Sequence, residues 1–404
     1  MSSAAPQRPL RPQDGSAPSD EALIDRVRER LAAESAEPTA AVIAEAIRAE
    51  SGGVLGDTDL LAALRHLQTE LTGAGRLEVL LSEPGVADVL VVGPTRVWVD
   101  RGSGLEPTDV TFDDDAAVRR LAARLALGAG RRLDDAQPWV DAQLTSLGRR
   151  GLTVRLHAVI PPLAADGTCI SLRVLRTAGM DMRGLITSGA IPDELVGVLE
   201  AMVAARLAFL IVGGTGSGKT TLLNALIGAM DPADRVLCVE DALELSPAHP
   251  HVVRLVARTS NVEGRGEVPV RVLVRQALRM RPDRIIVGEV RGAEVIDLLT
   301  ALNTGHEGSG GTLHANSTSE VPARMEALAA LGGMNREALH SQLAAAVRVV
   351  VGVSRTAGGA RGVVEVGLVS RNTEGWVTIL PIWLRSSGFT EHRAEFDALV
   401  EERL

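Results

Sequence analysis

The chain has 404 residues, of which 46% are hydrophobic, and its formal net charge is −9 at pH 7. This length allows two or three domains with substantial cores, and the negative charge argues against a protein that coats nucleic acid, although it does not exclude a local basic pore. Because no apolar run approaches the ~18 residues of a membrane span and the N-terminus lacks a signal-peptide stretch, we expect a cytoplasmic protein.

The first half of the chain predicts a short tail, a helical lead-in and a small domain. Residues 1–18 are rich in Pro, Ser and Ala, which predicts disorder. Residues 19–71 place apolar side chains at helical spacing. Residues 72–178 have the size of a single α+β domain. Its strand-like segments lie at 86–92, 97–100, 152–160 and 170–175, and a helical segment lies at 116–127.

The second half predicts an α/β domain. A helical segment at about 192–206 leads into the apolar run 207–212, which is typical of a buried parallel strand. From there strand and helix signals alternate to about residue 353, which predicts a doubly wound, mostly parallel sheet over 179–355. The remainder, 356–404, predicts a hairpin around a turn at 372–375, followed by a tail.

A phosphate-binding motif follows the strand at 207–212. Lys219 is the only lysine, and the other 41 long basic side chains are arginine. It completes the sequence Gly-Gly-Thr-Gly-Ser-Gly-Lys-Thr at 213–220, the P-loop pattern. A compact ammonium fits between the β- and γ-phosphate oxygens of a nucleotide, where a flat guanidinium is too wide. We therefore predict that the chain binds a nucleoside triphosphate.

The predicted nucleotide-binding residues form one continuous stretch. They are Gly213, Gly214, Thr215, Gly216, Ser217, Gly218, Lys219, Thr220 and Thr221. Glycines let the backbone curl so that its N–H groups point at phosphate oxygens. Thr220 opens a helix whose N-terminal dipole adds to the anion site, and its hydroxyl is the predicted Mg²⁺ ligand.

Two further apolar segments end in acidic residues. The segment 236–239 ends in Glu240 and Asp241, and we expect it to lie beside the P-loop strand, where a carboxylate can orient water toward the γ-phosphate. The segment 285–288 ends in Glu289 and is similar to a Walker B element, with Gly288 where an aspartate is common. We predict catalytic roles for Glu240 and Glu289. The alternative for each is a solvated acidic turn.

A glycine-rich stretch at 303–316 contains His306 and His314. We expect it to be a loop that senses the γ-phosphate through His, Thr and Asn side chains and moves when phosphate leaves. The alternatives are a metal site, for which no third ligand cluster has zinc spacing, and simple loop capping.

Nine arginines lie between Arg254 and Arg291. Arg275 and Arg279 are four residues apart, so we expect one helical face to present both guanidinium groups. Such groups suit the transition-state charge of a phosphoryl group and are often supplied by a neighbouring subunit. The alternative is ordinary surface charge, because in a chain with a single lysine arginine must also supply the basic groups of the surface.

The order of these motifs resembles the type II/type IV secretion ATPase family. The motifs are the P-loop, Val-Glu-Asp at 239–241, Gly-Arg-Gly-Glu-Val at 264–268, Leu-Arg-Met-Arg-Pro-Asp-Arg at 278–284, Gly-Glu at 288–289, and the segment 305–317 with Gly-His-Glu-Gly and His-Ala-Asn-Ser. Within that family the chain is most similar to the tight-adherence pilus branch (CpaF/TadA-like), including actinobacterial members associated with conjugal transfer. The resemblance extends from about residue 86 to residue 353.

This resemblance implies a RecA-like ATPase domain that hydrolyses ATP with Mg²⁺. It further implies a cytoplasmic homo-hexamer that is held peripherally at the inner membrane by a platform protein and powers pilus assembly or secretion. The rival functions are a DNA-translocating motor of a conjugation-like apparatus and a nucleotide-gated scaffold with little turnover. The acidic composition and the scarcity of aromatic residues argue against direct binding of nucleic acid, and the intact Glu240 and Glu289 argue against the scaffold.

The resemblance also implies roles for single residues. Glu240 is implied to be the catalytic carboxylate, Glu289 to position Mg²⁺ and water, and His314 to belong to a His box that begins at His306. Arg275 and Arg279 are implied arginine fingers. Arg173 and Arg176 lie where family members often reach toward phosphate. One departure is the sequence Gln-Leu-Thr-Ser-Leu-Gly at 143–148, where the family usually has an Arg-Leu-Pro-Asp-Gly hairpin.

Overall fold

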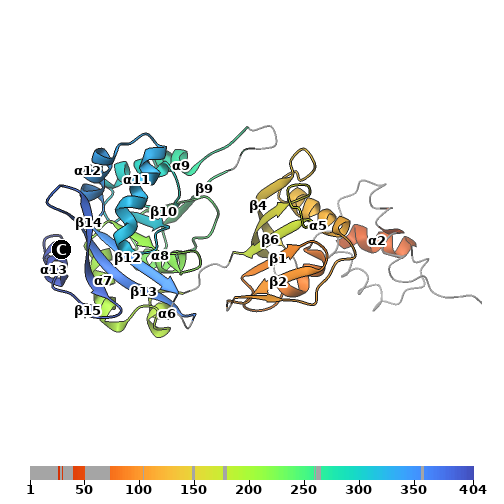
Figure 1. Ribbon diagram of the computed structural model, residues 1–404, viewed down its shortest axis with the longest axis horizontal. Coiled ribbons are helices and arrows are strands. Elements are labelled where there is room, and N and C mark those ends of the chain that lie inside the picture. The colour runs from red at the N-terminus through yellow and green to blue at the C-terminus, as the bar shows by residue number, and fades with distance from the viewer. Residues whose placement is uncertain are drawn as a thin grey trace, which may run out of the picture. The chain divides into compact units, whose positions relative to one another are not determined.

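The computed structural model describes residues 26–27, 30, 40–50, 73–102, 104–147, 151–175, 180–258, 260, 265–355 and 359–404. The chain divides into two compact units, Met1–Val174 and Leu175–Leu404 (Figure 1). Each unit has its own sheet and its own buried apolar clusters.

The N-terminal unit is built on a six-stranded antiparallel sheet with the order β3-β2-β1-β6-β5-β4. Val89 and Val91 of β1 point into the core, as the alternating burial of a half-covered strand requires. The strands are β1 (Asp88–Val92), β2 (Arg96–Asp100), β3 (Leu105–Pro107), β4 (Trp139–Leu147), β5 (Leu152–Val159) and β6 (Cys169–Val174). The sequence patterns did not predict β3 and β4. β3 is short and fully exposed, and β4 carries polar residues between its apolar ones.

The helices of this unit are α2 (Ala40–Glu50), η1 (Gly75–Leu77), α4 (Glu78–Leu81) and α5 (Asp115–Gly128). The start of α5 is capped by Asp114, whose side chain accepts a hydrogen bond of 2.7 Å from the backbone N–H of Ala117. The predicted disorder of residues 1–18 lies outside the described residues. Of the predicted lead-in, the structure describes residues 26–27, 30 and α2, where Ile43 and Ile47 are fully buried.

The C-terminal unit contains a nine-stranded sheet with the order β15-β14-β13-β12-β7-β11-β10-β8-β9. The segment from β12 to β9 is parallel, and β13, β14 and β15 add antiparallel strands at one side. The strands are β7 (Phe209–Val212), β8 (Val236–Glu240), β9 (Val252–Val256), β10 (Arg284–Val290), β11 (Gly310–Leu313), β12 (Val349–Arg355), β13 (Arg361–Arg371), β14 (Val377–Leu384) and β15 (Gly388–Phe389). The predicted α/β fold with a mostly parallel sheet is confirmed.

Helices cover both faces of this sheet. Phe209 and Ile211 of β7 pack with α6, α7, α8 and α13 on one face, and Leu210 and Val212 pack with α9 to α12 on the other (Figure 1). Strand residues that point alternately to two covered faces explain why 207–212 is apolar throughout. The helices are α6 (Met182–Thr187), α7 (Asp193–Ala204), α8 (Lys219–Gly228), α9 (Val270–Ala277), α10 (Glu294–Leu302), η2 (Thr318–Glu320), α11 (Val321–Leu331), α12 (Arg336–Ala346) and α13 (Arg393–Glu401).

The strand order corrects one expectation. We expected the strand that ends in Glu240 to lie beside the P-loop strand, but β11 and β10 lie between β7 and β8. The carboxyl ends of these parallel strands still meet at one edge of the sheet, where ligands of open α/β sheets bind. Chain order does not decide strand order, because β11 enters the sheet only after β8 and β10 along the sequence.

The stretch 303–316 is not one mobile loop, because β11 lies within it and is fully buried. A Cβ atom at Gly310 would lie 2.4 Å from Phe209 O, and one at Gly311 would lie 2.5 Å from Val287 O. These two glycines therefore let β11 fit between β7 and β10. The expectation of a loop is therefore wrong for Gly310–Leu313, and movement of the rest of the stretch when phosphate leaves stays a prediction.

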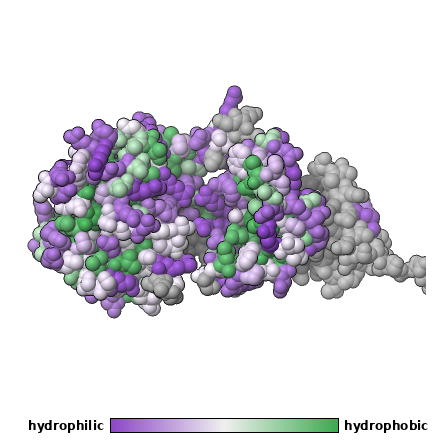
Figure 2. Space-filling model, in the orientation of Figure 1, coloured by the Kyte–Doolittle hydropathy of each residue, from purple (hydrophilic) through white to green (hydrophobic). Residues whose placement is uncertain are grey.

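On the face seen in Figure 2, hydrophilic residues cover much of both units and apolar residues are interspersed among them. Within the described residues, no helix combines the length and the apolar character needed to cross a membrane.

Candidate functional site

The P-loop forms a cradle at the carboxyl end of β7. Gly218 is the N-cap of α8 with φ 102°, a left-handed conformation that favours glycine. A Cβ atom at Gly213 would lie 2.2 Å from Val353 O and 2.7 Å from Ser217 Oγ. The loop therefore requires glycine at both positions, and it leads directly into the N-terminus of α8, where backbone N–H groups favour an anion.

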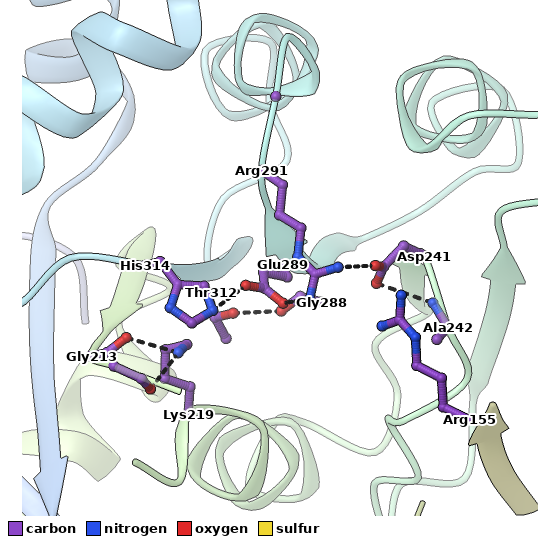
Figure 3. A network of polar contacts seen from close by, with 12 residues as sticks. Arg155, Gly213, Lys219, Asp241, Ala242, Gly288, Glu289, Arg291, Thr312 and His314 are labelled. Atoms are coloured by element: carbon purple, nitrogen blue, oxygen red, sulfur yellow. Dashed lines mark hydrogen bonds and ion pairs between the residues drawn. The ribbon is translucent and has the colours of Figure 1, made fainter. Parts of the chain in front are cut away.

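Lys219 lies inside this cradle and is 8% exposed. Its Nζ donates hydrogen bonds to Gly213 O at 2.8 Å and to Gly214 O at 2.9 Å (Figure 3). Burial lowers the pKa of the ammonium, while the charge of Glu289 opposes that effect. Among the described residues, the buried hydroxyl of Ser217 has no hydrogen-bond partner. A hydroxyl without a partner among the described residues, beside an ammonium in a glycine cradle, fits the phosphates of a nucleotide.

Glu289, near the end of β10, is the centre of a charged cluster (Figure 3). Arg291 forms ion pairs with both Glu289 and Asp241 and so joins the ends of β10 and β8. On its other side, Glu289 Oε1 lies 2.5 Å from His314 Nε2. Burial lowers the pKa of His314 below its usual value, an effect that Lys219 strengthens and Glu289 opposes. His314 therefore lies where it can act as a hydrogen-bonding group beside Glu289.

Glu240 is 3% exposed at the end of β8. Its Oε1 accepts hydrogen bonds from the backbone N–H of Glu244 at 3.0 Å and of Leu245 at 2.7 Å, and its Oε2 has no partner among the described residues. Burial raises the pKa of this carboxyl to about 7, and the two N–H bonds limit the rise. A Cβ atom at Gly288 would lie 2.9 Å from Glu240 Cγ. The glycine in the Walker B-like segment therefore makes room for Glu240.

We expect the substitution Glu240→Gln to stabilise the fold at pH 8 but not at pH 5. The folded-state pKa of about 7 lies above the ordinary 4.5. The protonated carboxyl of Glu240 therefore makes a contribution to stability that is fully present below pH 4.5 and is lost as the pH rises through 7. Glutamine cannot ionise, so the variant avoids a loss of about 3 kcal/mol in the free energy of unfolding at alkaline pH. Thermal unfolding of both chains at the two pH values measures this difference. Equal shifts at pH 5 and pH 8 would contradict it.

The two histidines of 303–316 lie at opposite ends of β11. His314 follows the carboxyl end beside Glu289, whereas His306 precedes the strand and its Nδ1 lies 3.1 Å from Ala301 O. In the part of the chain that the structure describes, no group of three or more His, Cys, Asp or Glu residues is arranged to hold a metal ion. The structure thus gives no support to the alternative of a protein-only metal site.

The predicted arginines lie in different environments. α9 ends at Ala277, so Arg279 lies in the turn beyond it and the helix presents Arg271 and Arg275 instead. Both of those bind Asp297 of α10, at 2.6 Å and 2.7 Å. Our expectation of one helical face with Arg275 and Arg279 is therefore wrong. Arg279 is exposed, and within the described residues its guanidinium makes no hydrogen bond or ion pair.

The two arginines that the family resemblance added lie at the end of the N-terminal unit. Arg173 of β6 forms an ion pair of 2.9 Å with Asp88 of β1, directly across the sheet. Arg176 lies outside the described residues. A role of either residue at the phosphate stays a prediction.

Sequence reasoning missed three residues of this region. Arg291 was one of many arginines, although its position two residues after Glu289 is a usable signal. Thr312 of β11 donates a hydrogen bond of 2.6 Å from its hydroxyl to Gly288 O and so fixes the strand beside it. Asn224 is a polar residue inside the apolar helix α8, a pattern that could have been noticed.

Comparison with known proteins gives consistent results. The family described as type II/IV secretion system protein matches residues 70–357. A putative conjugal transfer protein of Mycobacterium tuberculosis is 61% identical over 350 residues, which cover 87% of this chain and 99% of the relative. A probable conjugal transfer protein of Sinorhizobium fredii, TrbB, is 30% identical over 337 residues, which cover 82% of this chain and 96% of the relative.

Two solved structures share the fold. The pilus retraction motor PilT with bound ADP has a TM-score of 0.52 at 20% identity, with 81% of this chain and 86% of that chain covered. The Legionella pneumophila ATPase DotB has a TM-score of 0.52 at 20% identity, with coverage of 81% and 84%. At this level of identity the similarity concerns the fold alone.

Proposed function

Because this chain belongs to the type II/IV secretion system protein family, we propose that it is a motor that hydrolyses ATP to drive a secretion or conjugation apparatus. One observation carries the proposal. The only lysine of the chain lies in a glycine cradle, at the same sheet edge as Glu240, Glu289 and His314. A cavity of 410 Å³ beside Gly213, Gly214 and His314 adds space at this edge.

The residues of the cradle suit nucleotide binding. Lys219 would exchange its two carbonyl partners for β- and γ-phosphate oxygens, and the N-terminus of α8 would add its positive dipole. Thr220 and Glu289 would hold Mg²⁺. When bound, this ion neutralises charge on the phosphate oxygens. Arg291 and His314 flank Glu289 and would keep its carboxylate oriented.

Glu240 would direct the attacking water. Its Oε2, which has no hydrogen-bond partner in the part of the chain that the structure describes, is the atom that can accept a proton or a hydrogen bond from that water. A pKa of about 7 suits a group that must take up and release a proton near neutral pH. We therefore assign water positioning to Glu240 and metal positioning to Glu289.

The proposal includes a homo-hexameric ring in which a neighbour completes the site. Arg279 is the better candidate for that contribution, because Arg275 is already bound to Asp297 and Arg279 is exposed and unpaired among the described residues. An exposed guanidinium that reaches a neighbour's phosphate would stabilise the transition-state charge. Hydrolysis would then depend on assembly.

Phosphate release from Mg·ATP by the purified chain tests the proposal directly. We expect specific activity to rise with protein concentration and a hexamer to be visible by mass measurement when ATP is present. Mixing Arg279→Ala and Lys219→Ala chains should restore part of the activity, because each chain supplies the part that the other lacks.

The matched control uses a chain that carries both Arg279→Ala and Lys219→Ala in place of the Arg279→Ala chain. A mixture of this double variant with the Lys219→Ala chain contains no intact P-loop lysine, so the mixture should stay inactive. Turnover by a strict monomer that does not change with concentration would rule out the shared site.

A more specific proposal concerns the kind of apparatus that the motor drives. We propose the tight-adherence pilus branch, with a peripheral position at the inner membrane through a platform protein. The competing assignment is a conjugation motor, which the names of the conjugal transfer relatives from Mycobacterium tuberculosis and Sinorhizobium fredii favour. Stimulation of ATP turnover by DNA would support the conjugation motor acting on DNA. Stimulation by the cytoplasmic part of a membrane platform protein, and not by DNA, would support the pilus or secretion motor.

A further inference from the structure

Asn224 is a buried polar residue in the middle of α8, the helix that follows the P-loop. Its side chain is 3% exposed. The Nδ2 group donates a hydrogen bond of 3.0 Å to Thr220 O in the first turn of the same helix. Its Oδ1 accepts a hydrogen bond of 2.8 Å from the backbone N–H of Ser246. One side chain thus joins the first turn of α8 to the segment that follows β8.

That segment also holds the carboxylate of Glu240. The N–H groups of Glu244 and Leu245 both donate to Glu240 Oε1. Leu245 is fixed further by its buried side chain and by its carbonyl, which accepts a hydrogen bond of 3.2 Å from Arg254. Three successive peptide groups are therefore anchored. The first two position Glu240, and the third, that of Ser246, is held by Asn224.

We propose that Asn224 is a positioning residue for ATP hydrolysis, which acts on Glu240 through the peptide groups of residues 244–246. It also makes the position of Glu240 depend on the first turn of α8, which carries Thr220 and follows the phosphate cradle. This inference rests on the proposed ATPase function and on the water-directing role of Glu240.

The physical reason is the geometry of the two N–H donors. Without Asn224 Oδ1, the N–H of Ser246 lacks its acceptor and the segment can relax. A displacement of about 1 Å at a catalytic group is enough to lower turnover about 100-fold. Nucleotide affinity should stay, because the phosphate cradle at 213–220 does not include Asn224. The side chain also borders a cavity of 740 Å³ together with Ser246.

The experiment compares three full-length chains with the parent. Asn224→Ala should lower kcat about 10- to 100-fold and leave the Kd for a fluorescent ATP analogue unchanged. Asn224→Asp keeps an oxygen that accepts from Ser246 but loses the amide that donates to Thr220 O, so it should recover part of the turnover. Asn372→Ala is the matched control. It removes an amide oxygen that accepts hydrogen bonds from the backbone N–H groups of Glu374 at 3.1 Å and Trp376 at 2.8 Å in the turn between β13 and β14, and it should behave like the parent.

A second measurement does not depend on turnover. Amide hydrogen exchange in the peptide that covers 242–248 should be faster in Asn224→Ala than in the parent and in Asn224→Asp. Parent-like turnover and exchange in Asn224→Ala would overturn the inference, as would an Asn224→Asp chain as slow as Asn224→Ala. A loss of affinity equal to the loss of kcat would also overturn it. If the parent itself releases no phosphate from ATP, the proposed function fails.

Discussion

Replacing Lys219 with arginine should abolish ATP turnover although the positive charge is kept. The ammonium occupies a narrow position between the carbonyls of Gly213 and Gly214, and a planar guanidinium does not fit between phosphate oxygens there. We expect a loss of at least about 10²- to 10³-fold in kcat, or roughly 3–4 kcal/mol of transition-state stabilisation. Lys219→Ala should lose at least as much. Phosphate release at saturating ATP measures both effects.

The matched control is Arg119→Lys, which replaces a guanidinium with an ammonium at the surface. Arg119 forms an ion pair of 2.6 Å with Asp135, and its side chain is 40% exposed. Because exposed ion pairs contribute little, Arg119→Lys should keep the parent rate. A Lys219→Arg chain that hydrolyses ATP as fast as the parent would refute the assignment of the P-loop.

The second large effect concerns the two carboxylates. Glu240→Gln and Glu289→Gln should each keep nucleotide binding and lose about 10²- to 10⁴-fold in turnover. Glutamine preserves the shape of each side chain and removes the charge that orients water at Glu240 and Mg²⁺ at Glu289. Titration with a fluorescent ATP analogue gives the affinity, and phosphate release gives the rate.

Glu307→Gln is the control for this pair. Glu307 precedes β11 at the opposite edge of the same sheet and forms an ion pair of 3.2 Å with Arg403. Its substitution should leave binding and turnover unchanged. If Glu240→Gln or Glu289→Gln failed to bind the analogue, that carboxylate would have a structural role, and the division of labour proposed above would be wrong.

The glycine at position 288 links these two carboxylates. From the sequence alone it was a departure from the usual Walker B pattern, with no evident purpose. The structure supplies the reason, because the side chain of Glu240 occupies the space that a side chain at 288 would need. Two segments more than 40 residues apart in the sequence are therefore fitted to each other.

Local patterns were sufficient for the phosphate motif and for the fold class. A P-loop requires glycines and a lysine at fixed spacing, because the backbone itself forms the site, so Lys219 could be identified without a structure. The apolar run 207–212 predicted β7, because a strand covered on both faces excludes polar residues. The hairpin at the end of the chain was equally visible, since its turn residues and alternating strands are neighbours in the sequence.

Only the tertiary structure decided which distant residues meet. Strand order placed β11 and β10 between β7 and β8, and it gave Gly310 and Gly311 a packing role in place of the mobility that their composition suggested. The packing of α9 against α10 pairs Arg275 with Asp297, whereas Arg279 is exposed. The physical reason is the range of the forces involved. Spacing along the chain reports contacts within a turn or a strand, whereas burial, ion pairs and pKa shifts depend on neighbours that folding brings together from anywhere in the sequence.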